Sequence, residues 1–381
     1  MPSVLIMSSD AISIKIQARL LGALLAKNGF NVGLYTASSS MDAGRYSAFM
    51  NPQYIVYFYD PFLYPVIPTY LNSRHVIFYW TADGIPYSPI QKARLKSMCN
   101  MGTNIVNSML SKANMEAIGC NVSDVIHNAI DWMSLHNAVN AKPTYTFGVN
   151  ALYNYGGNKW YMDRKGYPAL IGMLYRLYSK GLKFTAWINT NDEMLTFIGS
   201  KFNVRNLIAH KVDYNAIVTV WQNTYDSGRF FSINSEPTYD KPVKITMSGS
   251  IKDISEFYGS IHYYLMNSYV EGFGVPPIEA LASGRFVIAN DIPTWHELVN
   301  TYDLHDCTRL IPIHAHKEYI WGVGDNKLQM DFNIPDFNEW MNVLEGAVYH
   351  NIKWNPGECS DKVRPLDYTF TYSKFLKYIT V

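Results

Sequence analysis

Short apolar segments of strand length alternate with amphipathic segments of helix length along the 381 residues. Near the N-terminus the apolar run 4–7 is followed by Ile16, Leu20 and Leu24 at helical spacing, and Gly29 then ends the helix. Strands that alternate with helices favour a parallel sheet with helices on both faces. The first part of the chain is therefore predicted to be a doubly wound α/β domain.

A polar stretch around Pro143 interrupts this alternation, which restarts immediately after it. We therefore place a first domain at residues 1–141 and a second at residues 142–365, and we expect a C-terminal helix at 366–381 to pack back on the first domain. The predicted fold class is α/β, with two Rossmann-like doubly wound domains facing a central cleft. Such domains bind ligands at the carboxyl ends of their parallel strands.

The charge balance limits the classes of partner. The chain has 32 basic and 31 acidic residues, a net charge of +1, which gives no electrostatic case for nucleic acid as a partner. Residues 1–140 contain nine basic and seven acidic side chains, so electrostatics favours at most weak peripheral contact with a membrane. The aromatic stretch at 54–70 leaves hydrophobic docking open, although packing into the core is favoured.

The cysteines and the termini suggest a compartment. Cys99, Cys120, Cys307 and Cys359 are dispersed and form no CxxC pair. No export signal is visible near residue 1, and no apolar run reaches the length that spans a bilayer. We therefore expect a cytoplasmic protein whose cysteines are reduced and mostly buried.

Several common catalytic motifs are missing. The first strand is not followed by G-x-G-x-x-G, and neither a Walker A loop nor a G-x-S-x-G elbow occurs. His296 begins an HExxH pattern, but Asn300 stands where the second histidine is required. His314 and His316 have no evident third ligand, and no DxD pair occurs. We therefore expect no metal and no cofactor.

The segment 267–284, NSYVEGFGVPPIEALASG, carries the strongest chemical signal. A buried strand ends at Asn267, a glycine-rich turn lets the backbone approach a ligand closely, and Pro277 fits the first turn of a helix. Free N–H groups at the helix start can bind a phosphate or sugar hydroxyls. Glu271 lies before the turn and Glu279 inside the helix, so both carboxylates can border one ligand.

This segment resembles the E-x7-E signature of glycosyltransferase family 4, a family of retaining enzymes with the GT-B fold. Three further segments resemble parts of the same family in the same order. Residues 105–131 resemble the end of its first domain, residues 163–166 its Lys-Gly phosphate motif, and residues 247–254 the step before its signature strand. The resemblance extends over most of the chain and is densest from residue 165 to residue 297.

The resemblance implies a role for each matching residue. Glu271 would face the donor sugar, and Lys165 would neutralise the leaving diphosphate, so these two are the candidate catalytic residues. Glu279 would accept hydrogen bonds from the ribose hydroxyls of the nucleotide. The turn would hold sugar hydroxyls or the diphosphate through the backbone of Gly272, Phe273, Gly274 and Val275.

The chain departs from the family pattern mainly on the acceptor side. An arginine that the family places before the Lys-Gly motif is absent; Lys159, in an apparent insertion, could supply that charge, and Arg164 is a weaker substitute. Ser13 stands near the family's Gly-Gly loop. Asp83 lies where the family often has a histidine, and it either binds acceptor or donor sugar or only forms a turn.

The resemblance implies retaining transfer of a hexose from a nucleoside-diphosphate sugar to a hydroxyl of an unknown glycan, lipid or protein, without a metal. The departures leave open the alternative of a catalytically inactive sugar-nucleotide or glycan-binding protein of the same fold. Epimerisation and phosphorolysis, which also occur on the GT-B fold, fit the signature segment less well.

Overall fold

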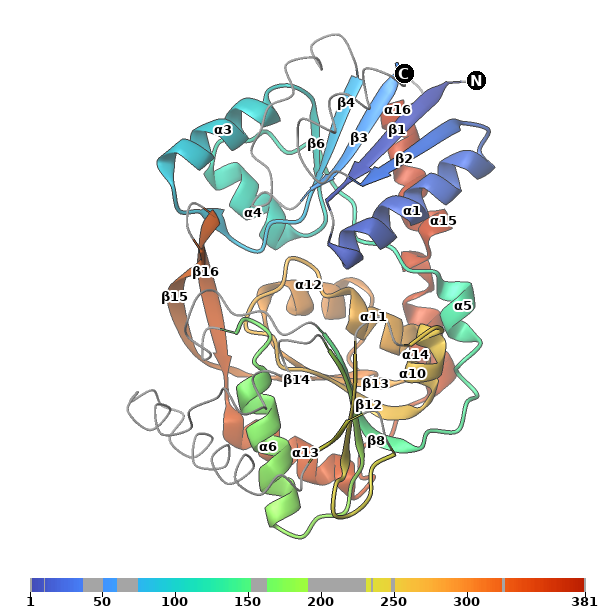
Figure 1. The fold of residues 1–381 in the computed structure, drawn as a ribbon, viewed down its shortest axis with the longest axis vertical. Coiled ribbons are helices and arrows are strands. Elements are labelled where there is room, and N and C mark those ends of the chain that lie inside the picture. The colour runs from blue at the N-terminus through green and yellow to red at the C-terminus, as the bar shows by residue number, and fades with distance from the viewer. Residues whose placement is uncertain are drawn as a thin grey trace.

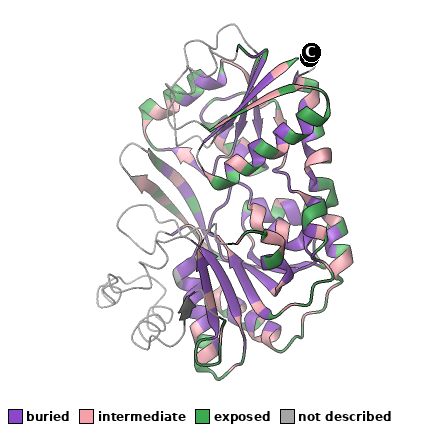
Figure 2. Ribbon diagram, turned by 45° about the vertical axis from the view of Figure 1, so that its right-hand side comes forward, coloured by how far each residue is buried: buried purple, intermediate pink, exposed green. Residues whose placement is uncertain are grey.

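A computed structural model describes residues 2–9, 11–36, 51–59, 75–151, 163–190, 231–233, 236–247, 251–323 and 326–379. The chain forms two α/β domains, one above the other in Figure 1, and both chain ends lie at the top, on the N-terminal domain. The strands of both sheets are mostly buried, whereas the helices that cover them expose one side (Figure 2). Each domain therefore has its own core.

The N-terminal domain contains a parallel sheet with the strand order β2-β1-β3-β4-β6-β7. Its strands are β1 (Ser3–Ser8), β2 (Asn31–Thr36), β3 (Tyr54–Tyr59), β4 (His75–Trp80), β6 (Thr103–Val106) and β7 (Asp124–Val125). Its helices are α1 (Ile12–Lys27), α3 (Pro89–Cys99), α4 (Met109–Ala117) and α5 (Trp132–His136). The predicted cap after α1 is confirmed, because Gly29 has a φ of 83° in the left-handed region that glycine favours.

Strand β3 accounts for the described part of the aromatic stretch at 54–70. It lies between β1 and β4, and Tyr54, Tyr57 and Phe58 are buried. These residues belong to the core and offer no membrane-docking surface.

The C-terminal domain contains a second parallel sheet with the order β10-β11-β9-β8-β12-β13-β14. Its strands are β8 (Tyr145–Asn150), β9 (Ala186–Thr190), β10 (Phe231–Ile233), β11 (Val243–Met247), β12 (Ile261–Met266), β13 (Phe286–Asn290) and β14 (Thr308–Ile311). Its helices are α6 (Tyr167–Ser179), α10 (Ile254–Gly259), α11 (Val275–Ala282), α12 (Pro293–Thr301), α13 (Phe337–Val348) and α14 (Pro356–Lys362). The apolar face of α6, with Leu170, Leu174 and Leu177, packs on this sheet.

A third, antiparallel sheet connects the two domains and has no counterpart in the predictions. The hairpin of β15 (Ile313–Val323) and β16 (Asn326–Pro335) leaves the C-terminal domain and pairs with β5 (Ile85–Pro86) of the N-terminal domain. The hairpin spans the left side of the molecule in Figure 1. His314 and His316 lie exposed on β15, and among the described residues no group of three or more His, Cys, Asp or Glu could hold a metal ion.

The end of the chain returns to the N-terminal domain, but as several short pieces instead of the single helix that we expected. These are the 3₁₀ helices η3 (Arg364–Leu366) and η4 (Tyr372–Phe375) and the α-helices α15 (Tyr368–Thr371) and α16 (Leu376–Ile379). Tyr372, Phe375 and Ile379 share one core cluster with Val4 and Ile6 of β1. The Tyr79 and Tyr372 rings meet edge to face within that cluster, with their centroids 6.3 Å apart.

The prediction of reduced cysteines is wrong, because the four cysteines form two disulfides. Cys99 pairs with Cys120, and Cys307 pairs with Cys359, across sequence separations of 21 and 52 residues. The end of α3 brings Cys99 beside Cys120, and α14 brings Cys359 beside the start of β14. Sequence spacing does not reveal such pairs, because packing of separate elements creates them. No helix in the described ranges is long and apolar enough to cross a membrane.

Candidate active site between the domains

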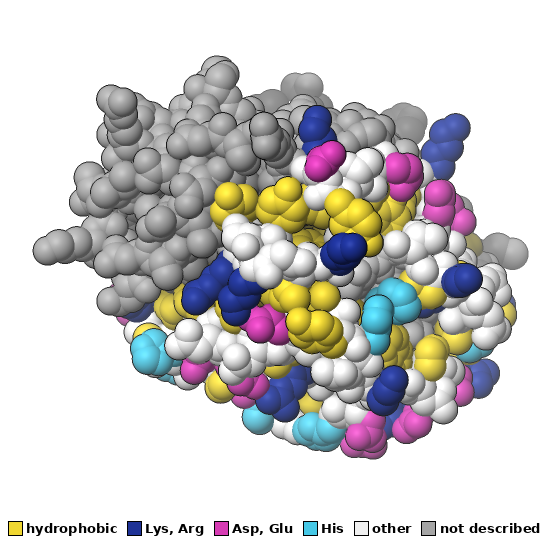
Figure 3. Space-filling model, turned by 90° about the horizontal axis from the view of Figure 1, so that it is seen from below, with side chains coloured by type: hydrophobic (Ala, Val, Ile, Leu, Met, Phe, Trp, Pro, Cys, Tyr) yellow, Lys and Arg dark blue, Asp and Glu magenta, His cyan; other side chains and the backbone are white. Residues whose placement is uncertain are grey.

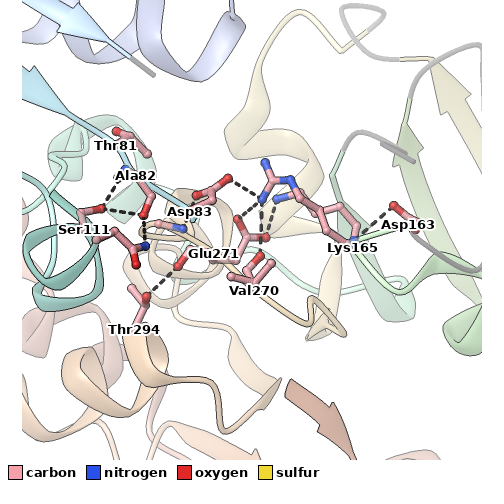
Figure 4. Close-up of polar contacts among 12 residues, drawn as sticks. Thr81, Ala82, Asp83, Ser111, Asp163, Lys165, Val270, Glu271 and Thr294 are labelled. Atoms are coloured by element: carbon pink, nitrogen blue, oxygen red, sulfur yellow. Dashed lines mark hydrogen bonds and ion pairs between the residues drawn. The ribbon is translucent and has the colours of Figure 1, made fainter. Parts of the chain in front are cut away.

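Three loops at the carboxyl ends of strands meet between the two domains. One loop follows β4 and carries Asp83, another precedes α6 and carries Lys165, and the third follows β12 and carries Glu271. Figure 4 shows these three side chains turned toward one another. The predicted location of the site at the carboxyl ends of parallel strands therefore agrees with the positions of these side chains.

Glu271 is the centre of a buried charge cluster. The residue is 6% exposed; one carboxylate oxygen contacts Lys165 Nζ, and the other lies 3.3 Å from Arg164 Nη1. Its backbone carbonyl accepts a hydrogen bond of 2.6 Å from Thr294 Oγ1 at the start of α12. Both the position and the charge of Glu271 are thus fixed by neighbouring elements.

Arg164 extends this cluster to the other domain. Its Nη1 lies 2.9 Å from Oδ2 of Asp83, while the other oxygen of Asp83 accepts a hydrogen bond from the backbone N–H of Gly272. The Arg164 guanidinium also lies 5.9 Å from the ring of Trp321 on the hairpin strand β15. Asp83 therefore does more than form a turn, because it joins the signature loop of the C-terminal domain to the N-terminal domain.

The turn that holds Arg164 and Lys165 has a specific construction. Asp163 is buried, and its carboxylate accepts hydrogen bonds from the backbone N–H of Lys165 at 3.2 Å and of Tyr167 at 2.8 Å. Gly166 precedes α6 with a φ of 65°, and a Cβ there would lie 2.3 Å from the carbonyl oxygen of Asn267. The sequence Asp-Arg-Lys-Gly thus places two cations at the start of α6, directly against the end of β12.

The glycine-rich turn before α11 leaves little room for side chains. A Cβ on Gly272 would lie 2.5 Å from Asp83 Oδ1, and one on Gly274 would lie 2.7 Å from Trp295 Nε1. Phe273 is 2% exposed and packs in the core of its domain, so only its backbone can meet a ligand. Among the described residues, no hydrogen bond occupies the N–H groups of Phe273, Gly274 or Val275, which leaves these donors available at the start of α11.

The opposing charges shift the ionisation of both partners of the central pair. Burial by itself raises the pKa of Glu271, but the cations of Lys165 and Arg164 outweigh it and hold that pKa below the ordinary value. Burial lowers the pKa of Lys165, and Glu271 offsets part of this effect. The site therefore contains a buried carboxylate beside two cations, an arrangement that can exchange partners with an incoming anion.

Glu279 lies further along, in α11, away from this cluster. Its carboxylate accepts a hydrogen bond of 2.7 Å from the hydroxyl of Tyr258, which in turn accepts one of 3.1 Å from the side-chain amide of Asn150. Burial raises the pKa of Glu279 to about 7. A half-buried carboxylate of this kind is suited to accept hydrogen bonds from neutral hydroxyls.

The N-terminal side of the site is held by α4 and bordered by α1. Ser111 Oγ accepts a hydrogen bond of 2.9 Å from the Ala82 N–H, and Asn107 Nδ2 donates one of 2.9 Å to Thr81 Oγ1. Ser13, in the first turn of α1, lines a small cavity of about 40 Å³ together with Thr81 and Asn128. Ser13 therefore borders the same loop as Asp83 without joining the charge cluster.

A second contact between the domains lies beside the first. His127 lies 3.0 Å from Glu297 of α12 through Nε2 and 2.7 Å from the Tyr302 hydroxyl through Nδ1. Glu297 also accepts a hydrogen bond of 2.9 Å from the N–H of Met109 at the start of α4. His127 thus ties the two domains together.

The structure brings together four of the predicted residues, Lys165, Glu271, Gly272 and Asp83, and it leaves Glu279 and Ser13 apart from them. Lys159 lies outside the described residues. Sequence reasoning undervalued Arg164, although it adjoins the predicted Lys165. It missed Thr294 and Tyr258, for which no motif gave a signal, because only packing brings them to the two glutamates.

Comparisons with known proteins agree with this architecture. Residues 237–322 match the family described as Glycosyl transferases group 1. The chain is 30% identical over 107 residues to the O-antigen chain mannosyltransferase RfbU of Salmonella typhimurium, over 27% of this chain and 30% of RfbU. It is 24% identical over 242 residues to uncharacterized glycosyltransferase 335 of Sulfolobus islandicus rod-shaped virus 1, over 63% of this chain and 62% of that protein. The matches thus span less than two thirds of either relative.

Solved structures match over the whole chain. HepE of Anabaena, in complex with UDP and glucose, matches with a TM-score of 0.62 at 12% identity, over 100% of both chains. Sucrose-phosphate synthase of Thermosynechococcus elongatus matches with a TM-score of 0.64 at 14% identity, over 99% of this chain and 98% of that one. The predicted fold class is confirmed: the chain has the GT-B fold of two Rossmann-like domains, and its residues 237–322 are similar to the family described as Glycosyl transferases group 1.

Proposed function

We propose that this protein transfers a hexose from a nucleoside-diphosphate sugar to a hydroxyl group of an acceptor. The observation that carries the proposal is the convergence of Arg164 and Lys165 on Glu271, where α6 and α11 begin. Two cations at the start of a helix favour an anion such as a diphosphate. A carboxylate beside them can accept hydrogen bonds from a sugar bound to that diphosphate.

The cations act on the leaving group. When the donor binds, its diphosphate takes the place of the carboxylates as the partner of Lys165 and Arg164, and the N–H groups of Gly274 and Val275 add further donors. Negative charge that develops on the departing diphosphate is then stabilised by groups that are already in place. This role needs no metal ion, since the chain supplies the positive charge.

We further propose that the transfer retains the configuration of the sugar, as the resemblance to family 4 implies. The bond from the sugar C1 to the diphosphate oxygen breaks, and a bond from C1 to the acceptor oxygen forms on the same face. The acceptor proton passes to the departing phosphate oxygen, so the products are the glycoside and the nucleoside diphosphate. Glu271 positions the donor sugar during this exchange.

The remaining candidate residues complete the donor and acceptor sides. Glu279 accepts hydrogen bonds from the ribose hydroxyls of the nucleotide, and Lys159 adds a further positive charge to the diphosphate side. Asp83 and Ser13 face the acceptor from the N-terminal domain. Closure of the two domains excludes water from the reacting groups.

The comparisons suggest which donors to try first. HepE was solved with UDP and glucose, and RfbU is named a mannosyltransferase. UDP-glucose and GDP-mannose are therefore the first donors to test, and ADP-glucose adds a third nucleotide base. The acceptor class, a glycan, lipid or protein hydroxyl, is left to the experiment.

Release of the nucleoside diphosphate tests the proposal. The protein is incubated with each sugar nucleotide, with and without simple glycan acceptors, while thermal shift reports binding of the same compounds. Release from one donor that depends on the acceptor, and is lost in Glu271→Gln but kept in the exposed control Glu256→Gln, supports the transferase. Binding of a donor without release under any condition would instead favour the inactive sugar-nucleotide-binding protein.

A further inference from the structure

A second cavity, of about 480 Å³, opens at the opposite end of the C-terminal sheet from the charge cluster. Residues at the amino ends of β13 and β14 line it, together with the end of α13 and the segment before α14, and they include Phe286, Thr308, Gly346 and Trp354. Strand β13 connects the two sites, because Phe286 begins it and Asn290, which ends it, donates a hydrogen bond to Ser268 O next to the signature loop. The two ends of β13 are about 13 Å apart, so the cavity and the signature loop lie at opposite ends of one strand.

The apolar part of the cavity is aromatic and held in place. Trp354 is half-buried, and its indole N–H donates a hydrogen bond of 3.0 Å to the carbonyl of Gly284. Its ring lies 5.7 Å from the ring of Phe286 and 5.3 Å from that of Tyr263. A fixed aromatic side chain offers a large contact surface at a small cost in conformational entropy.

One residue that lines the cavity also carries a buried polar group without a hydrogen-bond partner among the described residues. Thr308 is only 6% exposed, and its hydroxyl, in a residue that lines the cavity, forms no hydrogen bond with any described residue. Buried hydroxyl groups are almost always paired. The hydroxyl itself has almost no contact with solvent, so a ligand hydroxyl pairs with it only when the Thr308 side chain turns toward the cavity; a ligand hydroxyl can then both donate and accept.

Two basic side chains that line the cavity, Arg309 and Lys353, are balanced by two acidic ones, Asp306 and Glu358. Arg309 is paired with Glu339 at 2.5 Å, and Lys362 lies 3.7 Å from Asp306 and 3.5 Å from Glu358. Figure 3, which shows the molecule from below, likewise shows basic, acidic and hydrophobic side chains intermingled on this end. An arrangement of this kind gives no net attraction for a phosphate or a nucleotide.

We propose that this cavity is a second binding site, separate from the charge cluster, for an uncharged carbohydrate of one or two hexose units. A hexose presents an apolar face to an aromatic ring and hydroxyls at its edge, which fits Trp354 beside Thr308. The volume lies within the range of small-ligand pockets, about 300–1,000 Å³. The inference does not depend on the proposed transferase activity, because binding here uses none of the residues of the charge cluster.

Gly346 offers a clean way to fill the cavity. It lies in α13 and lines the cavity, and a Cβ placed on it meets no atom within 4 Å. Gly346→Phe therefore adds a ring to open space, whereas Gly346→Ala also replaces the glycine of the helix but adds only a single methyl group. Thr308→Val removes only the unpaired hydroxyl at nearly constant volume.

The test is a titration with maltose, cellobiose, mannobiose and lactose, followed by ¹H–¹⁵N NMR of the Trp354 indole, whose peak is assigned by its loss in Trp354→Phe. We expect at least one disaccharide to shift this peak saturably, with or without excess UDP. Gly346→Phe should weaken that binding at least tenfold and Thr308→Val severalfold, while Gly346→Ala should stay within twofold of the wild type.

Three results would overturn the proposal: no disaccharide shifts the peak, Gly346→Phe binds as well as the wild type, or inorganic phosphate or UDP displaces the sugar. Release of nucleoside diphosphate by Gly346→Phe is measured in parallel. A variant that loses disaccharide binding yet releases nucleotide at the wild-type rate separates this site from the proposed function. Absence of nucleoside-diphosphate release in the wild type would count against the proposed transferase activity and would not count against the second binding site.

Discussion

Glu271→Gln tests both the electrostatics and the proposed chemistry of the charge cluster. The substitution keeps the shape of the side chain and removes its negative charge from beside Lys165 and Arg164. The carboxylate no longer balances the two buried cations. We therefore expect a loss of folded-state stability and, separately, a loss of sugar transfer.

The size of the stability loss follows from the geometry. Arg164 Nη1 and Glu271 Oε2 are 3.3 Å apart, a separation at which unit charges attract by about 5 kcal/mol at an effective dielectric constant of 20. Desolvation offsets much of this gain, and removal of one partner from a buried pair costs about 3–5 kcal/mol. Because Arg164 keeps Asp83 and glutamine can still accept a hydrogen bond, we expect a loss of about 3 kcal/mol, which is a fall of roughly 4 °C in Tm for cooperative unfolding of 381 residues.

The loss should depend on pH in a defined direction. Burial raises the pKa of Glu271, but Lys165 and Arg164 outweigh it, so the pKa is lower in the folded state than in the unfolded state. The stabilisation is therefore complete above the unfolded pKa of about 4.3 and disappears as the pH falls through the lower folded pKa. The difference between wild type and Glu271→Gln should be full at pH 7 and shrink below about pH 4.

Calorimetric unfolding at pH 7 and pH 3.5 measures this difference. Glu256→Gln is the matched control, because Glu256 is an exposed residue of α10, and its change should stay within about 0.5 kcal/mol. In the release assay Glu271→Gln should lose at least about 100-fold in rate. Equal stability of wild type and variant at pH 7, or near-normal turnover in the variant, would refute the reasoning.

Three further predictions concern the leaving-group cations, the second carboxylate and a disulfide. Arg164→Met and Lys165→Met should each lower kcat/KM for the sugar nucleotide by about 10²–10³-fold, measured as nucleotide release, and an unchanged kcat/KM in both would contradict their proposed role. Burial raises the pKa of Glu279 to about 7, so donor affinity measured by calorimetry should rise as the pH passes upward through about 7, and Glu279→Gln should abolish this dependence. Because the pKa of Glu279 is higher in the folded state, the folded state binds this proton more tightly than the unfolded state does. As the pH rises from about 4 to about 7, the wild type should therefore lose stability relative to Glu279→Gln. The disulfide Cys307–Cys359 closes a loop across 52 residues, and replacing both cysteines with alanine should lower the free energy of unfolding by about 2–4 kcal/mol in urea titrations; a stability equal to that of the wild type would show that the bond contributes nothing.

Local patterns in the sequence were sufficient for many of the elements and for the alternation of strands and helices in both domains. The helix over α11 and its limits at Gly274 and Gly284 follow from the glycines and prolines of one continuous segment. The first strand and helix follow in the same way from apolar spacing. Such features depend on residues that are neighbours in the chain, so the chain itself contains the information.

Contacts between distant segments could not be predicted in this way. The hairpin β15–β16 meets the other domain at β5, where Leu328 pairs with Pro86 and Gln329 with Ile85. No local pattern marks that pairing. The disulfides are a second case, because the cysteines meet only after helices and strands have packed. Long-range pairing depends on the relative placement of whole elements, which single-sequence periodicity does not encode.

Some features of the candidate site likewise followed from local sequence, whereas others depended on contacts between distant segments. The sequence by itself determined that Glu271 would follow a buried strand, that Lys165 would stand at a helix start, and that both would lie at the carboxyl ends of parallel strands. Only the tertiary structure decided that Arg164 would join Glu271 to Asp83 across the domain boundary, 107 and 81 positions away in the chain. The physical reason is that a buried charge is stable only beside an opposite charge, and the packing of the two domains decides which opposite charge lies close enough.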